Sequence, residues 1–162
     1  RAPVARRVDG AGRCAAGSSA AVAVDSPNDR QPPVAIVAPR TVEEAVDTIA
    51  VCAELGVPVL SRGGGTSLAG QTTNRAVVID WTKYCHHLIS VDVDARTCVV
   101  ELGIALDELN RLLAEHDLMF GPKPPTHRSC TLVVMILNNS FGSIAQASGT
   151  TGHPHPPQEC VT

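Results

Sequence analysis

Aromatic side chains are scarce in this sequence: Trp, Tyr and Phe together make up 2% of its 162 residues. Because hydrophobic residues still reach 44%, we expect a buried core, which must be built from Val, Leu, Ile and Ala. No apolar run approaches the roughly 20 residues of a membrane-spanning helix. The net charge of −3 argues against a nucleic-acid-binding surface. We therefore expect neither an integral membrane span nor a nucleic-acid partner.

The chain also lacks the spacings typical of disulfide frameworks and metal sites. Its six cysteines include no C-x-x-C pair, and a chain of this size and apolar content needs no disulfides. His86 and His87 would point to opposite sides of a strand, so they do not predict a metal pair. The basic stretch 1–7 has no apolar h-region, and we interpret it as a disordered extension, with a mitochondrial-type presequence as the alternative. These observations favour a cytoplasmic protein with reduced thiols.

Three regions differ in composition. Residues 1–23 are rich in Ala, Gly, Arg and Ser without periodicity, which predicts a flexible amino-terminal arm. Residues 24–151 contain the periodic segments, and we interpret them as two small subdomains, 24–82 and 83–151. Residues 152–162 form a divergent tail with three prolines within 154–157.

The pattern of the first subdomain predicts a parallel strand–helix–strand unit followed by one more strand. Residues 34–37 and 57–61 are its strands, and 76–79 is the additional buried strand. Thr41 with Glu44 has the spacing of a capping box, and Gly56 is expected to end the helix. One apolar face of this helix should meet the core. It comprises Val42, Ala45, Val46, Ile49 and Ala53.

The second subdomain is predicted to contain an antiparallel hairpin and a helix. Residues 89–93 and 97–101 flank a turn at 94–96. In helix 105–116 the leucines at 106, 109, 112 and 113 should point inward. Prolines impose an extended course on the start of segment 121–142. From the residues alone, we expect this segment to be a proline-ordered loop leading into an apolar strand.

The most informative segment, residues 62–70, follows strand 57–61. Glycines 63–65 remove every Cβ, so the backbone can bend sharply and its N–H groups can converge on an anion. Arg62, Thr66 and Ser67 add a positive charge and two hydroxyl donors. A flexible surface loop is the alternative, but the preceding strand and the hydroxyl pair favour an anion site. The motif is neither a Walker-type loop nor Gly-x-Gly-x-x-Gly.

Residues 39–44, 62–71, 76–80, 100–103, 120–124, 130–131 and 138–140, in this order, resemble one flavoprotein family. It is the FAD-binding domain (PCMH type) of the vanillyl-alcohol oxidase family, in its D-lactate dehydrogenase and glycolate oxidase branch. The resemblance implies an α+β fold of two small α/β subdomains with FAD in the groove between them, the second subdomain being incomplete. It also implies cofactor contacts from both subdomains. These are Arg62, Gly63, Gly64, Gly65, Thr66, Ser67, Gly70, Gln71, Pro124, Thr126, Thr131, Asn138, Ser140, Gly142 and Gly149.

The same resemblance implies a function. Thr66 stands where covalently flavinylated members carry His, so FAD is expected to bind non-covalently. The reaction implied is oxidation of a 2-hydroxy acid such as D-lactate or glycolate. The catalytic cap domain of the family is absent from this segment, so we expect the chain alone to be inactive and a polypeptide supplying that domain to be a partner. A cell-wall nucleotide-sugar reductase, which shares this fold, is the less favoured assignment.

Four positions depart from the family pattern. Val133 and Val134 replace a Gly-Gly pair, while Leu137 and Phe141 replace small residues. Valine at such places predicts clashes and unfavourable dihedral angles, which would weaken FAD binding. An acidic residue expected two positions after Thr151 is a histidine. The alternative function is therefore a non-enzymatic remnant that binds FAD poorly, or docks on a partner through the apolar surface so created.

Overall fold

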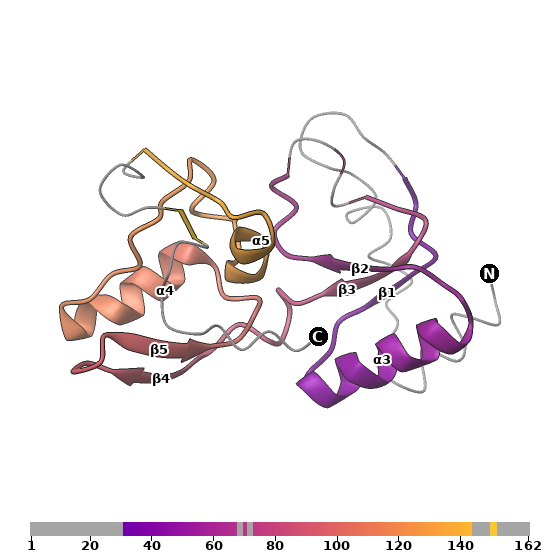
Figure 1. Cartoon of the computed structure of the whole chain (residues 1–162), viewed down its shortest axis with the longest axis horizontal. Helices are drawn as coiled ribbons and strands as arrows, with labels where there is room; N and C mark the ends of the chain where they lie inside the picture. The colour runs from indigo at the N-terminus through magenta and orange to yellow at the C-terminus, as the bar shows by residue number, and fades with distance from the viewer. Residues whose placement is uncertain (1–30, 68–69, 71–72, 144–149, 152–162) are drawn as a thin grey trace.

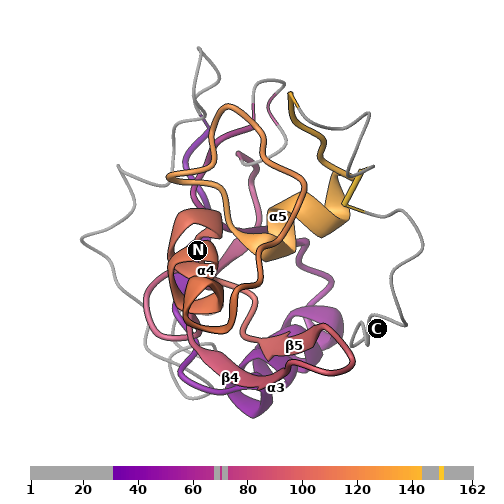
Figure 2. The same cartoon turned by 90° about the vertical axis from the view of Figure 1, so that its left-hand side faces the viewer.

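The structure, a computed structural model, describes residues 31–67, 70, 73–143 and 150–151. Its elements form two lobes (Figure 1). A three-stranded sheet with helix α3 (Val42–Glu54) makes up one lobe, and a two-stranded hairpin with helix α4 (Leu106–Leu113) makes up the other. Helix α5 (Leu132–Leu137) lies between them. Seen from the hairpin side, α4 and the hairpin face the viewer with α3 behind them (Figure 2).

The sheet of the first lobe confirms the expected parallel unit. Strand β3 (Val77–Asp80) lies in the middle and pairs in parallel with β1 (Ala35–Val37) and β2 (Val59–Arg62). Helix α3 covers one face through Cys52, which packs on β1 and β3. Because all three strands are parallel, their carboxyl ends share one edge, and the glycine segment leaves β2 at that edge.

The capping signals of α3 are present in the structure. The Thr41 hydroxyl accepts the N–H of Glu44 at 3.3 Å. The Glu44 carboxylate accepts the N–H of Arg40 at 2.7 Å, whereas in a capping box it would accept the N–H of Thr41. At the other end, Gly56 has φ of 61° and allows the chain to turn out of the helix.

The prediction of which face of α3 is buried is wrong: of the residues predicted to meet the core, only Ala45 is buried. Ala45, Thr48 and Cys52 are buried, whereas Val42, Val46 and Ile49 are 46–50% exposed. The small side chains of the true face bring the helix close to the sheet. Thr48 can be buried because its hydroxyl donates to the Glu44 carbonyl at 2.7 Å. The helix carries two competing stripes, and the one with larger apolar side chains is the exposed one.

Replacing Thr41 by alanine is expected to lower the free energy of unfolding by about 1 kcal/mol, because the Glu44 amide loses its side-chain acceptor. Urea unfolding followed by circular dichroism measures this. Thr41→Ser keeps the hydroxyl and should behave like the unmodified chain. An alanine variant with unchanged stability would contradict a capping role.

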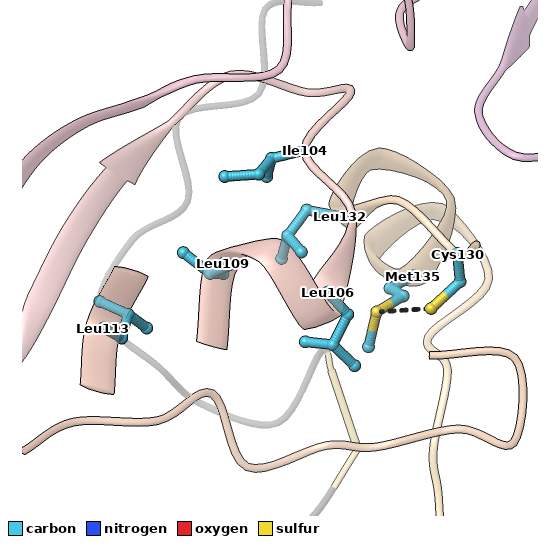
Figure 3. Packing of buried hydrophobic residues seen from close by; sticks show 7 residues of the cluster. All are labelled: Ile104, Leu106, Leu109, Leu113, Cys130, Leu132 and Met135. Atoms are coloured by element: carbon cyan, nitrogen blue, oxygen red, sulfur yellow. Dashed lines mark hydrogen bonds between the residues drawn. The ribbon is translucent and has the colours of Figure 1, made fainter. Parts of the chain in front are cut away.

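The second lobe confirms the predicted hairpin and helix. Strands β4 (Leu88–Asp92) and β5 (Thr97–Val100) pair antiparallel, and α4 continues into a short 3-10 helix, η2 (Ala114–His116). The core of this lobe joins α4 to the start of α5 (Figure 3). In it, the Cys130 thiol lies 3.6 Å from the Met135 sulfur. Burial raises the pKa of Cys130, so its thiol stays protonated.

The prediction of an apolar strand after the proline segment is wrong, because residues 132–137 form α5. A short apolar run does not distinguish a buried strand from a buried helix. Residues 132–137 are apolar on more than one face of the helix because both lobes pack on it. Leu132 and Met135 enter the core of the second lobe, while Val133 and Val134 pack with Ala45, Ile79, Trp81 and Cys85 of the first lobe and the connection.

The predicted backbone strain at the valines is also wrong. Val133 and Val134 have helical conformations and are 7% and 9% exposed. Among the described non-glycine residues, only Arg96, Asp117 and Asn139 have positive φ. The valines therefore join the two lobes and form no apolar surface, whereas Leu137 and Phe141 are 66% and 67% exposed.

Two further features concern the expected location and redox state. In the described ranges, no helix has the length and hydropathy to cross a membrane. Cys52, Cys85, Cys98 and Cys130 are free thiols.

Candidate functional site

The glycine segment after β2 packs directly against the chain that leads into α5. A Cβ added to Gly63 would overlap the hydroxyl of Thr131 and lie 2.8 Å from Val134 Cγ2. A Cβ added to Gly64 would overlap the carbonyl oxygen of Ser129. Gly64 thus meets the main chain of Ser129, and Gly63 meets the side chains of Thr131 and Val134, at distances that only glycine permits.

The turn continues through Gly65, whose φ of 69° is unfavourable for other residues. The guanidinium group of Arg62 lies next to this glycine, because a Cβ there would overlap Arg62 Nη2. Arg62 is 8% exposed. A buried positive charge therefore lies beneath the loop, as an anion site requires.

Beside the loop lies a groove with a volume of about 620 Å³. Two segments contribute its lining, which consists of Gly64, Gly65, Thr66, Pro125, Thr126, His127, Arg128 and Ser129. Among the residues that the structure describes, the lining contains main chain, hydroxyls, an imidazole and a guanidinium, but no carboxylate. This composition suits a ligand with negatively charged oxygens.

The second wall of the groove, residues 125–131, is held by hydrogen bonds to α4. The amides of Leu106 and Asp107 donate to the carbonyls of Cys130 and His127, at 3.1 and 3.3 Å. These bonds take the place of a side-chain cap, which α4 lacks. Within the wall, the Ser129 amide donates to the Thr126 carbonyl at 2.8 Å. The wall is therefore attached to a helix, which supports a fixed groove shape.

One hydroxyl at the base of the groove has no partner. Thr131 is 2% exposed, and its Oγ1 makes no hydrogen bond within the described part of the chain. It is the same oxygen that a Cβ at Gly63 would overlap. Buried hydroxyls without partners are rare, and an absent ligand, water or ion accounts for many of them.

A histidine–carboxylate pair stands at the groove. His127 Nδ1 lies 2.7 Å from Asp107 Oδ1, and the two side chains are 28% and 40% exposed. The neighbouring Arg128 is exposed and forms no ion pair among the residues that the structure describes. Neither His127 nor Arg128 was predicted from the sequence, because neither residue belongs to a recognisable ligand spacing.

Comparison of the sequence with known protein families shows to which family the chain belongs. A family profile described as FAD binding domain matches residues 33–153, most of the chain and both walls of the groove. The chain belongs to this FAD-binding domain family. The sequence resemblance to the vanillyl-alcohol oxidase flavoproteins is thereby confirmed.

Curated relatives of this FAD-binding domain are oxidoreductases of three kinds. It is 31% identical to a D-2-hydroxyglutarate dehydrogenase of Haemophilus influenzae, over 82% of this chain and 13% of that protein. It is also 31% identical to a mitochondrial D-lactate dehydrogenase (cytochrome) of Kluyveromyces lactis, over 74% of this chain and 21% of that protein. For glycolate oxidase subunit GlcD of Bacillus subtilis the identity is 28%, over 78% and 27%. The chain thus spans between about an eighth and about a quarter of these relatives.

Solved structures support the fold. A xylooligosaccharide oxidase from Myceliophthora thermophila superimposes with a TM-score of 0.75 at 22% identity, covering 91% of this chain and 32% of that one. The protein BBE-like 1 of Physcomitrella patens superimposes with a TM-score of 0.74 at 20% identity, covering 90% of this chain and 33% of that one. At such identities the match concerns the fold alone. It confirms the expected α+β architecture, of which this chain covers a part.

The residues of the FAD-binding domain fit its cofactor at the glycine loop. The loop lacks side chains where it meets the opposite wall, and the unpartnered Thr131 hydroxyl lies behind it. Of the predicted contacts, Gly64, Gly65, Thr66 and Thr126 line the groove. Gly63, next to the lining residue Gly64, packs on Thr131, and the Arg62 guanidinium lies next to the lining residue Gly65.

The remaining predicted contacts that the structure describes do not line this groove. Asn138 donates from Nδ2 to the Val134 carbonyl at 3.0 Å, at the carboxyl end of α5. Ser140 accepts the Thr151 hydroxyl through its carbonyl at 2.7 Å. A Cβ on Gly142 would overlap the Lys123 carbonyl and lie 2.8 Å from the Pro124 nitrogen. Ser67 and Gly70 lie farther along the loop, while Gln71 and Gly149 are outside the described residues.

Proposed function

We propose that this chain binds FAD non-covalently in the groove beside residues 64–66 and 125–129. We also propose that it forms the cofactor-binding part of an oxidoreductase acting on a 2-hydroxy acid. The observation that carries the proposal is the close contact of Gly63 and Gly64, which have no side chains of their own, with the wall at Ser129 and Thr131. The names of the relatives support the substrate class, since D-2-hydroxyglutarate, D-lactate and glycolate are all 2-hydroxy acids.

The residues of the groove have distinct roles in this proposal. The amides of residues 64–66 and the hydroxyls of Thr66 and Thr126 donate hydrogen bonds to the diphosphate. The buried guanidinium of Arg62 compensates its negative charge. When bound, the flavin supplies the acceptor for the hydride that leaves the substrate carbon. The residues of this groove bind and orient the cofactor, and they contribute no proton transfer.

The sequence of the loop supports the proposal of non-covalent attachment. Thr66 lines the groove at the position where the covalently flavinylated members carry His, and a threonine hydroxyl does not form such a link. Acid precipitation of the loaded protein should leave all flavin absorbance in the supernatant. Flavin that remains in the pellet would contradict this part of the proposal.

The full chain is expected to quench FAD fluorescence in a saturable titration and to become yellow. The physical reason is transfer of the cofactor from water to a preformed groove. Thermal unfolding provides an independent measurement, since a ligand that binds only the folded state raises the melting temperature. A chain that stays colourless in excess FAD, with unchanged fluorescence and melting temperature, would overturn the proposal.

A second candidate function, a unit that docks on another polypeptide, is favoured by one observation. Leu137 and Phe141, near the end of α5, are 66% and 67% exposed. We propose that a polypeptide with the substrate-binding and catalytic residues covers them. The chain alone should then show no turnover of D-lactate or glycolate with an artificial electron acceptor, even when loaded with FAD. Turnover by the chain alone would refute the need for that partner.

A further inference from the structure

The groove contains an imidazole that the FAD contacts described above leave unused. His127 lines the groove opposite Gly64, Gly65 and Thr66. It is attached to α4 twice: its ring nitrogen Nδ1 lies 2.7 Å from Asp107 Oδ1, and its carbonyl accepts the Asp107 amide at 3.3 Å. Both the backbone and the ring plane of His127 are therefore held from the same helix residue.

The contact with Asp107 determines which ring nitrogen of His127 is available to a ligand. An ionised carboxylate only accepts hydrogen bonds, so Nδ1 carries a hydrogen and donates it to Asp107. This contact sets the orientation of the ring. Nε2 is the other polar atom of the ring, and no residue in the described ranges hydrogen-bonds to it. With both nitrogens protonated, Nε2 becomes a donor for an anionic ligand.

The charges around His127 also favour an anion. Arg128 follows it in the same wall, and Arg62 lies beneath Gly65 in the opposite wall. Asp107 of α4 is the carboxylate that faces the ring, and it is engaged with Nδ1. Within the described part of the chain, no carboxylate belongs to the groove lining itself.

We propose that His127, oriented by Asp107, donates a hydrogen bond from Nε2 to the diphosphate of the bound dinucleotide. This inference rests on the proposed function and adds a histidine–carboxylate pair to its binding residues. Asp107 touches no ligand and acts as a positioning residue. The competing possibility is a purely structural pair that ties the wall of the groove to α4.

The variant His127→Asn distinguishes the ligand contact from the purely structural pair. An asparagine amide can donate to Asp107 in place of Nδ1–H, but it does not reach as far as Nε2. We expect its dissociation constants for FAD and for ADP to rise between about tenfold and a hundredfold, as for loss of a charge-assisted hydrogen bond. ADP carries the diphosphate without a flavin, and calorimetry measures its binding. His116→Asn is the matched control, since His116 is exposed on η2 and lies outside the groove.

Asp107 gives a second and independent test. Asp107→Asn keeps an oxygen acceptor for Nδ1–H, whereas Asp107→Ala removes it. Affinity for ADP should therefore be retained better in Asp107→Asn than in Asp107→Ala. In addition, the ¹⁵N signal of His127 Nε2, assigned by its loss in His127→Asn, should move to that of a hydrogen-bonded N–H when ADP is added to the unmodified chain.

The outcomes distinguish this inference from the proposed function. If the unmodified chain binds FAD and ADP and His127→Asn binds them equally well, the contact is refuted while FAD binding stands. If the chain binds ADP but not FAD, the proposed function fails, and the loss of ADP affinity in His127→Asn still supports the contact. An Nε2 signal that ADP leaves unchanged refutes the contact, as does a chain that binds neither ligand.

Discussion

Alanine at position 64 is expected to weaken FAD binding by about a hundredfold or more. The added Cβ would overlap the Ser129 carbonyl, which belongs to the backbone and cannot rotate away. The loop and the opposite wall must then separate, at a cost typical of overpacking, about 1–3 kcal/mol. The amide donors of the loop move from their positions as well, and each 1.4 kcal/mol lost is about tenfold in affinity. Flavin fluorescence titration measures the change, and Gly64→Asp should abolish binding.

Gly56→Ala is the matched control for this prediction. Gly56 has positive φ, unlike Gly64, but a Cβ there meets nothing within 4 Å, and it lies at the end of α3 away from the groove. It should lower the melting temperature and leave FAD affinity unchanged. If Gly64→Ala binds FAD as tightly as the unmodified chain, the contact between the two walls does not form the cofactor site.

Restoring glycine at both 133 and 134 is expected to lower the free energy of unfolding by about 3–5 kcal/mol. Each substitution removes a buried valine side chain, worth about 1.5–3 kcal/mol, and places glycine within a helix, at about 1 kcal/mol relative to alanine. The two effects partly overlap because the residues are neighbours. Since domains are stable by only about 5–15 kcal/mol, the double variant should be close to unfolding at 25 °C. Urea denaturation measures the loss.

This prediction opposes the expectation from the family pattern, in which glycine at these positions would improve FAD binding. The structure accounts for the difference, because both valines pack against Ile79 and Trp81 and neither lines the groove. Leu137→Gly is the control within the same helix: it changes the helix propensity, but its side chain is 66% exposed and leaves no cavity. A double glycine variant with unchanged stability and tighter FAD binding would show that the valines obstruct the cofactor.

Apart from the parallel sheet, the predictions that the structure confirms depend on interactions between residues near in sequence. Thr41 and Gly56 bound a helix because caps and left-handed turns involve only neighbouring residues. The hairpin around residues 94–96 is confirmed for the same reason. The predictions that failed concern which side of α3 is buried and whether the apolar run 132–137 forms a strand or a helix. On α3, small residues at 45, 48 and 52 pack on the sheet, and periodicity alone did not distinguish them from the larger apolar stripe.

The candidate site divides in the same way. The glycine loop could be found from residues 62–67 because three adjacent glycines at the end of a strand favour a close turn of bare main chain. His127 could not, because its partner Asp107 lies 20 positions away on α4. The signal that was available was the position of His127 between segments 120–124 and 130–131, both of which resemble the flavoprotein family.

By itself, the sequence determined the order of the elements, the glycine loop and the family, because each depends on short runs of residues that can be compared directly. Only the tertiary structure decided that Gly64 touches Ser129, that Val133 and Val134 join the lobes, and that His127 faces the loop. These contacts form between segments that are distant in the sequence. Tertiary packing determines which of their surfaces meet, and a local sequence pattern does not contain that information.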